Sequence, residues 1–91
     1  MNISAKVGDE RVADVRFDSQ RLIVDLADGR TIAVPLAWYP RLQSATPAQR
    51  SNWTRAGGGF GIHWPDVDED LSVAGLLSGN PAPGASRRAA R

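Results

Sequence analysis

Three short segments between residues 12 and 35 alternate apolar and polar side chains, and the turns between them restrict how the segments can pair. Apolar residues recur at every second position, a pattern typical of strands with one buried face. We therefore predict a three-stranded antiparallel meander. Its predicted buried face comprises Ala13, Val15, Phe17, Leu22, Val24, Leu26, Ile32 and Val34.

The two turns of this meander predict its register, because residues directly opposite each other in an antiparallel pair share a face. A two-residue first turn places Phe17 opposite Leu22. In the second turn, a three-residue loop ending at Gly29 places Val24 opposite Ile32, whereas a two-residue loop would set apolar residues against polar ones. The three-residue loop requires a left-handed backbone at its third position, which Gly29 readily adopts.

Two short helices are predicted after the meander. Pro40 favours a helix start. The N–H groups of the first helical turn have no hydrogen-bond partner within the helix, so a proline, which lacks an N–H group, loses nothing there. Thr46 and Gln49 have the spacing of a capping box, in which the two residues satisfy each other's backbone N–H groups. That helix is predicted to run to about residues 53–55. Its buried side, covering the apolar face of the meander, would include Leu42, Ala45 and Trp53.

A fourth strand and a last helical turn are predicted in the final third of the chain. Residues 60–64 alternate again, which places Phe60, Ile62 and Trp64 on one side. Ser72 is a suitable N-cap for a helical turn that Gly79 would end. The predicted fold class is therefore α+β, with a three-stranded antiparallel meander plus a fourth strand, packed by two or three short helices.

The chain length predicts one hydrophobic core. With 91 residues the sequence is short for two domains. We predict a single domain over residues 12–79, an N-terminal lead over 1–11, and a disordered arginine-containing tail over 80–91. A domain of this size buries only about 60% of the surface that its unfolded chain exposes, so its stability is expected to be marginal.

Composition excludes several classes of protein. The absence of cysteine excludes disulfides, thiolate zinc sites and cysteine nucleophiles. No apolar run approaches the roughly 20 residues that span a bilayer, and the charged N-terminal segment lacks the pattern of a signal peptide. We therefore expect a cytoplasmic protein with no membrane partner.

His63 is the one histidine of the chain and the centre of the enzymatic alternatives. A triad with Ser72 and an aspartate is formally available, but the serine lies in no nucleophile elbow. The spacing of His63 to the nearby acidic residues matches neither a calcium loop nor a two-histidine zinc motif. We predict no catalytic, cofactor-binding or metal-binding residue, and an enzyme or metal site at His63 is the weakest alternative.

The acidic run at residues 66–70 is the most distinctive charge feature of the sequence. One interpretation is a solvated loop that also favours the start of the next helix through the helix dipole. A compatible interpretation is a docking site for a basic partner, with the bend around Trp38 alongside it. The predicted partner-binding residues are Trp38, Arg41, His63, Asp66, Asp68, Glu69 and Asp70.

The run Trp64-Pro65-Asp66-Val67-Asp68-Glu69-Asp70-Leu71-Ser72 is also the most specific motif in the chain. It occurs together with Leu22-x-Val24-x-Leu26, Asp28-Gly29-Arg30, Val34-Pro35-Leu36, Tyr39-Pro40-Arg41-Leu42, Ala45-Thr46, Trp53, Gly59, Ile62-His63 and Leu76-Leu77-x-Gly79. With these motifs, residues 12–79 resemble a bacterial family, the domain of unknown function numbered 2442. Its fold is like the N-terminal domain of a nitrosomonad structural-genomics protein.

This resemblance implies a small α+β fold without established catalysis. Some members look like the antitoxin half of a two-gene toxin–antitoxin module, and others carry a helix-turn-helix domain that this sequence lacks. The resulting expectation is a non-catalytic protein-binding module with an antitoxin-like role, and no enzyme. Its partner would be a small, basic, toxin-like protein encoded nearby.

A nucleic-acid-associated regulator is the alternative from a different class. It would use the tail arginines together with a basic helix face, and phosphate contacts of this kind weaken as salt increases. The residues in question are Arg41, Arg50, Arg55, Arg87, Arg88 and Arg91. The sequence also leaves a homodimer open.

Overall fold

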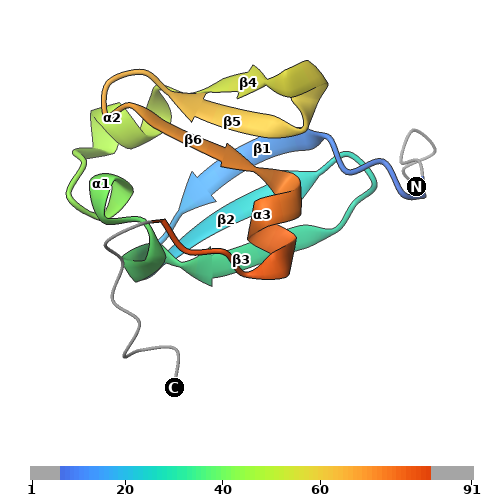
Figure 1. Cartoon of the computed structure of the whole chain (residues 1–91), viewed down its shortest axis with the longest axis horizontal. Helices are drawn as coiled ribbons and strands as arrows, with labels where there is room; N and C mark the ends of the chain where they lie inside the picture. The colour runs from blue at the N-terminus through green and yellow to red at the C-terminus, as the bar shows by residue number, and fades with distance from the viewer. Residues whose placement is uncertain (1–6, 83–91) are drawn as a thin grey trace.

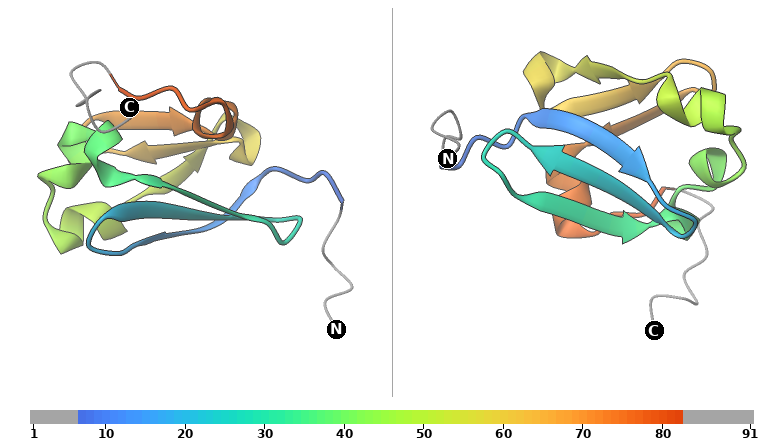
Figure 2. Two further views of the ribbon diagram at one scale, coloured as in Figure 1. Left: turned by 90° about the horizontal axis from the view of Figure 1, so that it is seen from below. Right: turned by 180° about the vertical axis from the view of Figure 1, so that it is seen from behind.

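Two three-stranded antiparallel sheets lie face to face in this protein, as Figures 1 and 2 show. The computed structural model describes residues 7–82. The first sheet consists of β1 (Val12–Phe17), β2 (Arg21–Leu26) and β3 (Thr31–Pro35), and the second of β4 (Thr54–Ala56), β5 (Gly61–Trp64) and β6 (Glu69–Ser72). The α-helices are α1 (Pro40–Gln43), α2 (Pro47–Ser51) and α3 (Val73–Ser78), and η1 (Leu36–Trp38) and η2 (Gly57–Gly59) are 3-10 turns. The predicted α+β class is confirmed.

The predicted register of the meander is also confirmed. Phe17 lies opposite Leu22, and Val24 lies opposite Ile32. Gly29 has a φ of 95°, and its N–H donates to the Leu26 carbonyl at 3.0 Å. The three-residue loop therefore forms as predicted from the pairing of apolar residues across the two strands.

One position of the predicted apolar face is wrong. Ala13 is exposed, whereas Val12 and Val15 are buried. The register of β1 against β2 shifts between Val12 and Asp14, which is the signature of a β-bulge. The extra residue turns Ala13 outward and brings Val12 into the core.

The capping box forms, but the helix that it starts is shorter than predicted. Thr46 accepts a hydrogen bond from the Gln49 N–H at 3.1 Å, and the Gln49 side chain accepts one from the Thr46 N–H at 3.0 Å. The helix ends at Ser51, and residues 54–56 form β4 instead of further helical turns. Pairing with β5 provides hydrogen-bond partners for the backbone of residues 54–56. The predicted fourth strand, β5, thus lies at the centre of a second sheet, between β4 and β6.

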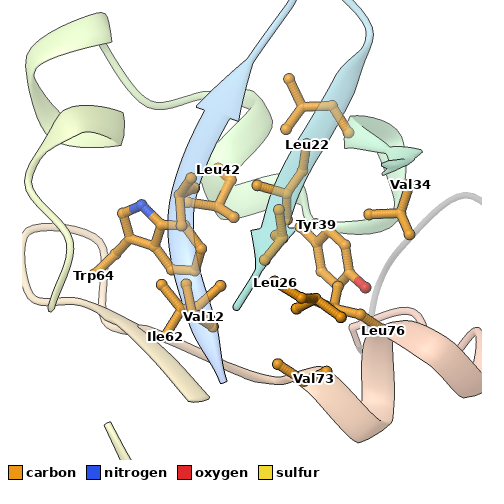
Figure 3. Close-up of a cluster of buried hydrophobic side chains, with 13 residues drawn as sticks. Val12, Leu22, Leu26, Val34, Tyr39, Leu42, Ile62, Trp64, Val73 and Leu76 are labelled. Atoms are coloured by element: carbon orange, nitrogen blue, oxygen red, sulfur yellow. The ribbon is translucent and has the colours of Figure 1, made fainter. Parts of the chain in front are cut away.

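The core lies between the two sheets. Figure 3 shows side chains from β1, β2 and β3 meeting those of β5 and α3. The fully buried side chains are Trp64, Tyr39, Leu22, Leu42, Ile62, Val24 and Val73. Trp38 and Trp53 are only partly buried at its margin. The second sheet and the helices together cover the meander. The sequence predicted helices and only one further strand in this position.

The last helix begins and ends where predicted. Ser72 accepts a hydrogen bond from the Gly75 N–H at 2.9 Å, and Gly79 ends the helix with a φ of 76°. The Ala82 N–H donates to the Trp38 carbonyl at 3.0 Å, so residues 80–82 remain packed on the domain. The rest of the predicted tail, at 83–91, lies outside the described residues, as does the lead at 1–6. None of the helices described is long and apolar enough to cross a membrane.

Candidate functional site

The β5–β6 hairpin divides the acidic run between a turn and a strand. Residues 66–68 form the turn, whereas Glu69 and Asp70 begin β6. The prediction of a continuous solvated loop is therefore wrong for its second half, because β6 pairs with β5. Glu69 lies opposite the buried Trp64, and Asp70 lies opposite His63. Strand alternation thus directs Glu69 inward and Asp70 toward solvent.

His63 belongs to a surface pair on the outer face of this hairpin. Its Nδ1 lies 2.6 Å from Asp70 Oδ1. Ser72, the serine of the hypothetical triad, has its hydroxyl oxygen engaged as the N-cap of α3. Within residues 7–82, no three His, Asp or Glu side chains gather where they could hold a metal ion.

Arg41 connects α1 to the acidic turn. Its guanidinium Nη1 donates to the Asp68 carbonyl, and Asp68 has a left-handed backbone with a φ of 53°. On the other side of the turn, Asn52 Nδ2 donates to Asp66 Oδ2 at 3.0 Å. The structure therefore places Arg41 in contact with Asp68, and Asp66 lies in the same turn.

Trp38 lies apart from that cluster. Its ring faces the end of α3 at Gly79, and its carbonyl accepts the hydrogen bond from Ala82. The ring of this predicted partner-binding residue is partly buried against the core. Trp38 thus contributes to packing at the end of α3.

A cavity of about 270 Å³ lies along the open edge of β6. Glu69 and Tyr39 line it, and only 7% of Glu69 is exposed. Burial raises the pKa of Glu69, although the nearby charge of Arg41 opposes this. Burial and the negative charge of Glu69 raise the pKa of the Tyr39 hydroxyl. Tyr39 was not predicted as a site residue, because its proximity to Glu69 joins two segments that are distant in the sequence.

The raised pKa of Glu69 predicts a specific pH dependence of stability. Between the ordinary glutamate pKa of about 4.3 and the higher folded-state value, the folded protein holds a proton that the unfolded chain releases. Stability should therefore fall as pH rises through this window. E69Q cannot ionise, so its free energy of unfolding relative to the wild type should increase across the window and then level off.

Urea unfolding of both proteins from acid to neutral pH measures this difference. D14N is the control, because Asp14 is an exposed carboxylate on β1 far along the chain from the cavity. A difference between E69Q and the wild type that stays constant with pH would contradict the assigned role of burial. Subtracting the two curves removes the acid effects of the other carboxylates, such as Asp25, whose pKa is lowered mainly by its hydrogen bond from Arg16.

The predicted basic face is engaged within the fold. Arg50 donates to the carbonyls of Leu42 and Gln43 at 2.9 and 2.8 Å. Arg55 donates to the carbonyls of Val12 and Ala13. These contacts hold α1 and the bulge of β1. The tail residues Arg87, Arg88 and Arg91 lie outside the described part of the chain.

Comparisons with known proteins agree with this fold. A crystal structure of a protein of unknown function from Rhodospirillum rubrum ATCC 11170 is 38% identical, with a TM-score of 0.68 over 81% of this chain and 92% of that chain. A solution NMR structure of an uncharacterized protein from Chromobacterium violaceum is 21% identical, with a TM-score of 0.69 over 92% of this chain and 91% of that chain. The model of a family described as protein of unknown function (DUF2442) matches residues 12–82, which confirms the resemblance seen in the sequence. The comparison with curated proteins gave no match.

Proposed function

This chain belongs to the DUF2442 family of proteins of unknown function, and we propose that it is a non-catalytic module that binds a basic protein. The observation that carries the proposal is the link from Arg41 to the Asp68 carbonyl. This contact joins α1 to the β5–β6 turn and makes one surface of them. We call this surface, formed by Arg41, Asp66 and Asp68, the acidic-turn surface.

The acidic-turn surface has the negative charge and the fixed conformation expected of a docking site. Arg41 and Asn52 hold the turn from two sides, so little conformational entropy remains to be lost on binding. Asp66 and Asp68 are exposed, and neither forms an ion pair within the described part of the chain. Their charges are therefore available to a basic partner, for which they would raise the association rate and select an orientation.

An antitoxin-like role is the finer form of this proposal. It rests on the resemblance of some family members to the antitoxin half of two-gene modules. In this form the partner is a small basic protein encoded by the adjacent gene. Binding would neutralise that protein by covering its basic surface, without any chemical step.

Co-expression of this chain with the adjacent gene product, followed by affinity measurement, tests the proposal. We expect D66N/D68N to weaken binding by about tenfold, which corresponds to a loss of about 1.4 kcal/mol in binding free energy for the two charges. Most of the loss should come from slower association, because exposed charges mainly accelerate the encounter of the two proteins. Asparagine also tolerates the left-handed backbone at Asp68. Glu69 stays unchanged, because it lies in β6 and is not part of the acidic-turn surface.

The matched control is E10Q/D14N, which removes two acidic charges at the other end of the chain. It should bind like the wild type. Equal affinity and equal association rate for D66N/D68N and the wild type would remove the acidic-turn surface from the proposal. Failure of the wild-type chain to bind the adjacent gene product would refute the antitoxin-like form.

A further inference from the structure

We propose that the cavity along the open edge of β6 takes a lysine or arginine side chain of the partner, presented on an extended segment. The proposal rests on the proposed function, since both require a basic protein partner. It adds a second contact beside the acidic-turn surface. It also gives Glu69 and Tyr39 a role in recognition.

The size and lining of the cavity suit one long basic side chain. Its volume of about 270 Å³ is just below the roughly 300–1,000 Å³ typical of pockets for small molecules. Leu71, Leu76 and Ala82 provide apolar walls, along which the methylene groups of a lysine or arginine can pack. Glu69 and Tyr39 provide the polar groups. Figure 3 shows the Tyr39 hydroxyl directed toward Leu76.

The Glu69 carboxylate is a buried charge without an ion-pair partner among residues 7–82. No side chain in the described part of the chain pairs with it, although the backbone N–H of Asp70 and the charge of Arg41 favour its ionised form. Arg41 itself is bonded to the Asp68 carbonyl. In residues 7–82, every fully buried side-chain nitrogen or oxygen has a hydrogen-bond partner. Any Glu69 carboxylate oxygen without a partner is therefore accessible from the cavity. A guanidinium or ammonium group in the cavity would complete the pair and offset the cost of burying the charge.

The edge of β6 fits an extended segment. β6 pairs with β5 on one side only, and all its residues line the cavity on the other side. Figure 1 shows β6 at the margin of the second sheet, leading into α3. The unpaired N–H and C=O groups of an edge strand can pair with an added strand. Alternate side chains of that strand would then point to one face, where Glu69 lies.

A titration of the full chain with a capped peptide tests this site by ¹H–¹⁵N NMR. The probe is acetyl-Val-Thr-Arg-Val-Thr-amide, and its control carries citrulline, a neutral analogue of arginine. We expect saturable shifts at the amides of β6 and of Tyr39 for the arginine peptide. The citrulline peptide should bind at least about tenfold more weakly, because it cannot pair with the Glu69 charge.

Variants of the chain decide whether Glu69 is responsible. E69Q keeps the size of the side chain and should bind the arginine peptide as weakly as the wild type binds the citrulline peptide. D14N removes the same charge elsewhere and should leave the affinity unchanged. Equal affinity of the wild type for both peptides, unchanged affinity in E69Q, or no shift at millimolar peptide would each overturn the cavity proposal.

The same variants separate this proposal from the proposed function. If E69Q binds the protein partner like the wild type while D66N/D68N does not, the cavity proposal fails and the proposed function stands. If D66N/D68N binds the partner like the wild type while E69Q still weakens the peptide complex, the acidic-turn surface fails and the cavity stands.

Discussion

W64A is expected to lower the free energy of unfolding by about 3–5 kcal/mol, the usual cost of truncating a buried tryptophan. Trp64 is fully buried at the end of β5, and its ring lies in an edge-to-face arrangement with the Phe17 ring across the two sheets, with centroids 6.3 Å apart. Its Nε1 also donates to the Arg50 carbonyl at 3.1 Å. Removing the side chain therefore leaves a cavity, separates the sheets and deprives a carbonyl of its donor.

The effect should be visible in thermal unfolding. A domain of this size loses about 4–8 °C in melting temperature per kcal/mol, so W64A should melt at least about 12 °C below the wild type. W64F should be intermediate, since it fills part of the space but cannot donate to Arg50. W38A is the matched control, because Trp38 is only partly buried at the margin of the core. A melting temperature of W64A equal to or above that of W38A would contradict this account of the core.

The parts of the fold that the sequence predicted are those that depend on neighbouring residues. Gly29 requires a particular turn, and that turn determines the pairing of Val24 with Ile32. The capping box of Thr46 with Gln49 spans four residues and forms as expected. In each case the interacting groups are close in sequence, so local chemistry determines the outcome.

The parts that the sequence did not predict depend on partners distant in the chain. Residues 54–56 follow a helix and contain no strong alternation, and only their pairing with β5 makes them a strand. The bulge at Ala13 coincides with the carbonyl contacts of Arg55, which lies 42 residues further along the chain. Such nonlocal contacts leave little trace in a short window of sequence.

The candidate site shows the same division. The acidic run indicated where a charged surface lies, and the structure joins Arg41 to it through Asp68. The inward direction of Glu69 could not be predicted while residues 66–70 were interpreted as a solvated loop. Once β6 is known to pair with β5, the position of Glu69 opposite Trp64 follows from strand alternation. Tyr39 completes the cavity from a distant element.

R55A should destabilise the protein by about 2 kcal/mol, because a charged donor that bonds backbone carbonyls contributes more than a neutral one. Arg55 on β4 donates from Nε to the Val12 carbonyl at 2.8 Å and from Nη2 to the Ala13 carbonyl. Its guanidinium also lies over the Trp53 ring, 5.2 Å from the centroid. It thus connects the second sheet to the outer edge of β1, which pairs with β2 only.

Two further variants separate this bridging role from a general effect of charge. R55K keeps the charge but loses the planar pair of donors, so it should recover less than half of the lost stability. R16A removes an arginine of β1 whose exposed ion pair with Asp25, at 2.9 Å, should contribute little to stability, because solvent screens it. Urea unfolding measures all three. Equal losses in R55A and R16A would mean that the carbonyl contacts of Arg55 add nothing to the attachment of the two sheets. A larger loss in R55A, together with faster amide exchange in β1, would support the bridging role of Arg55.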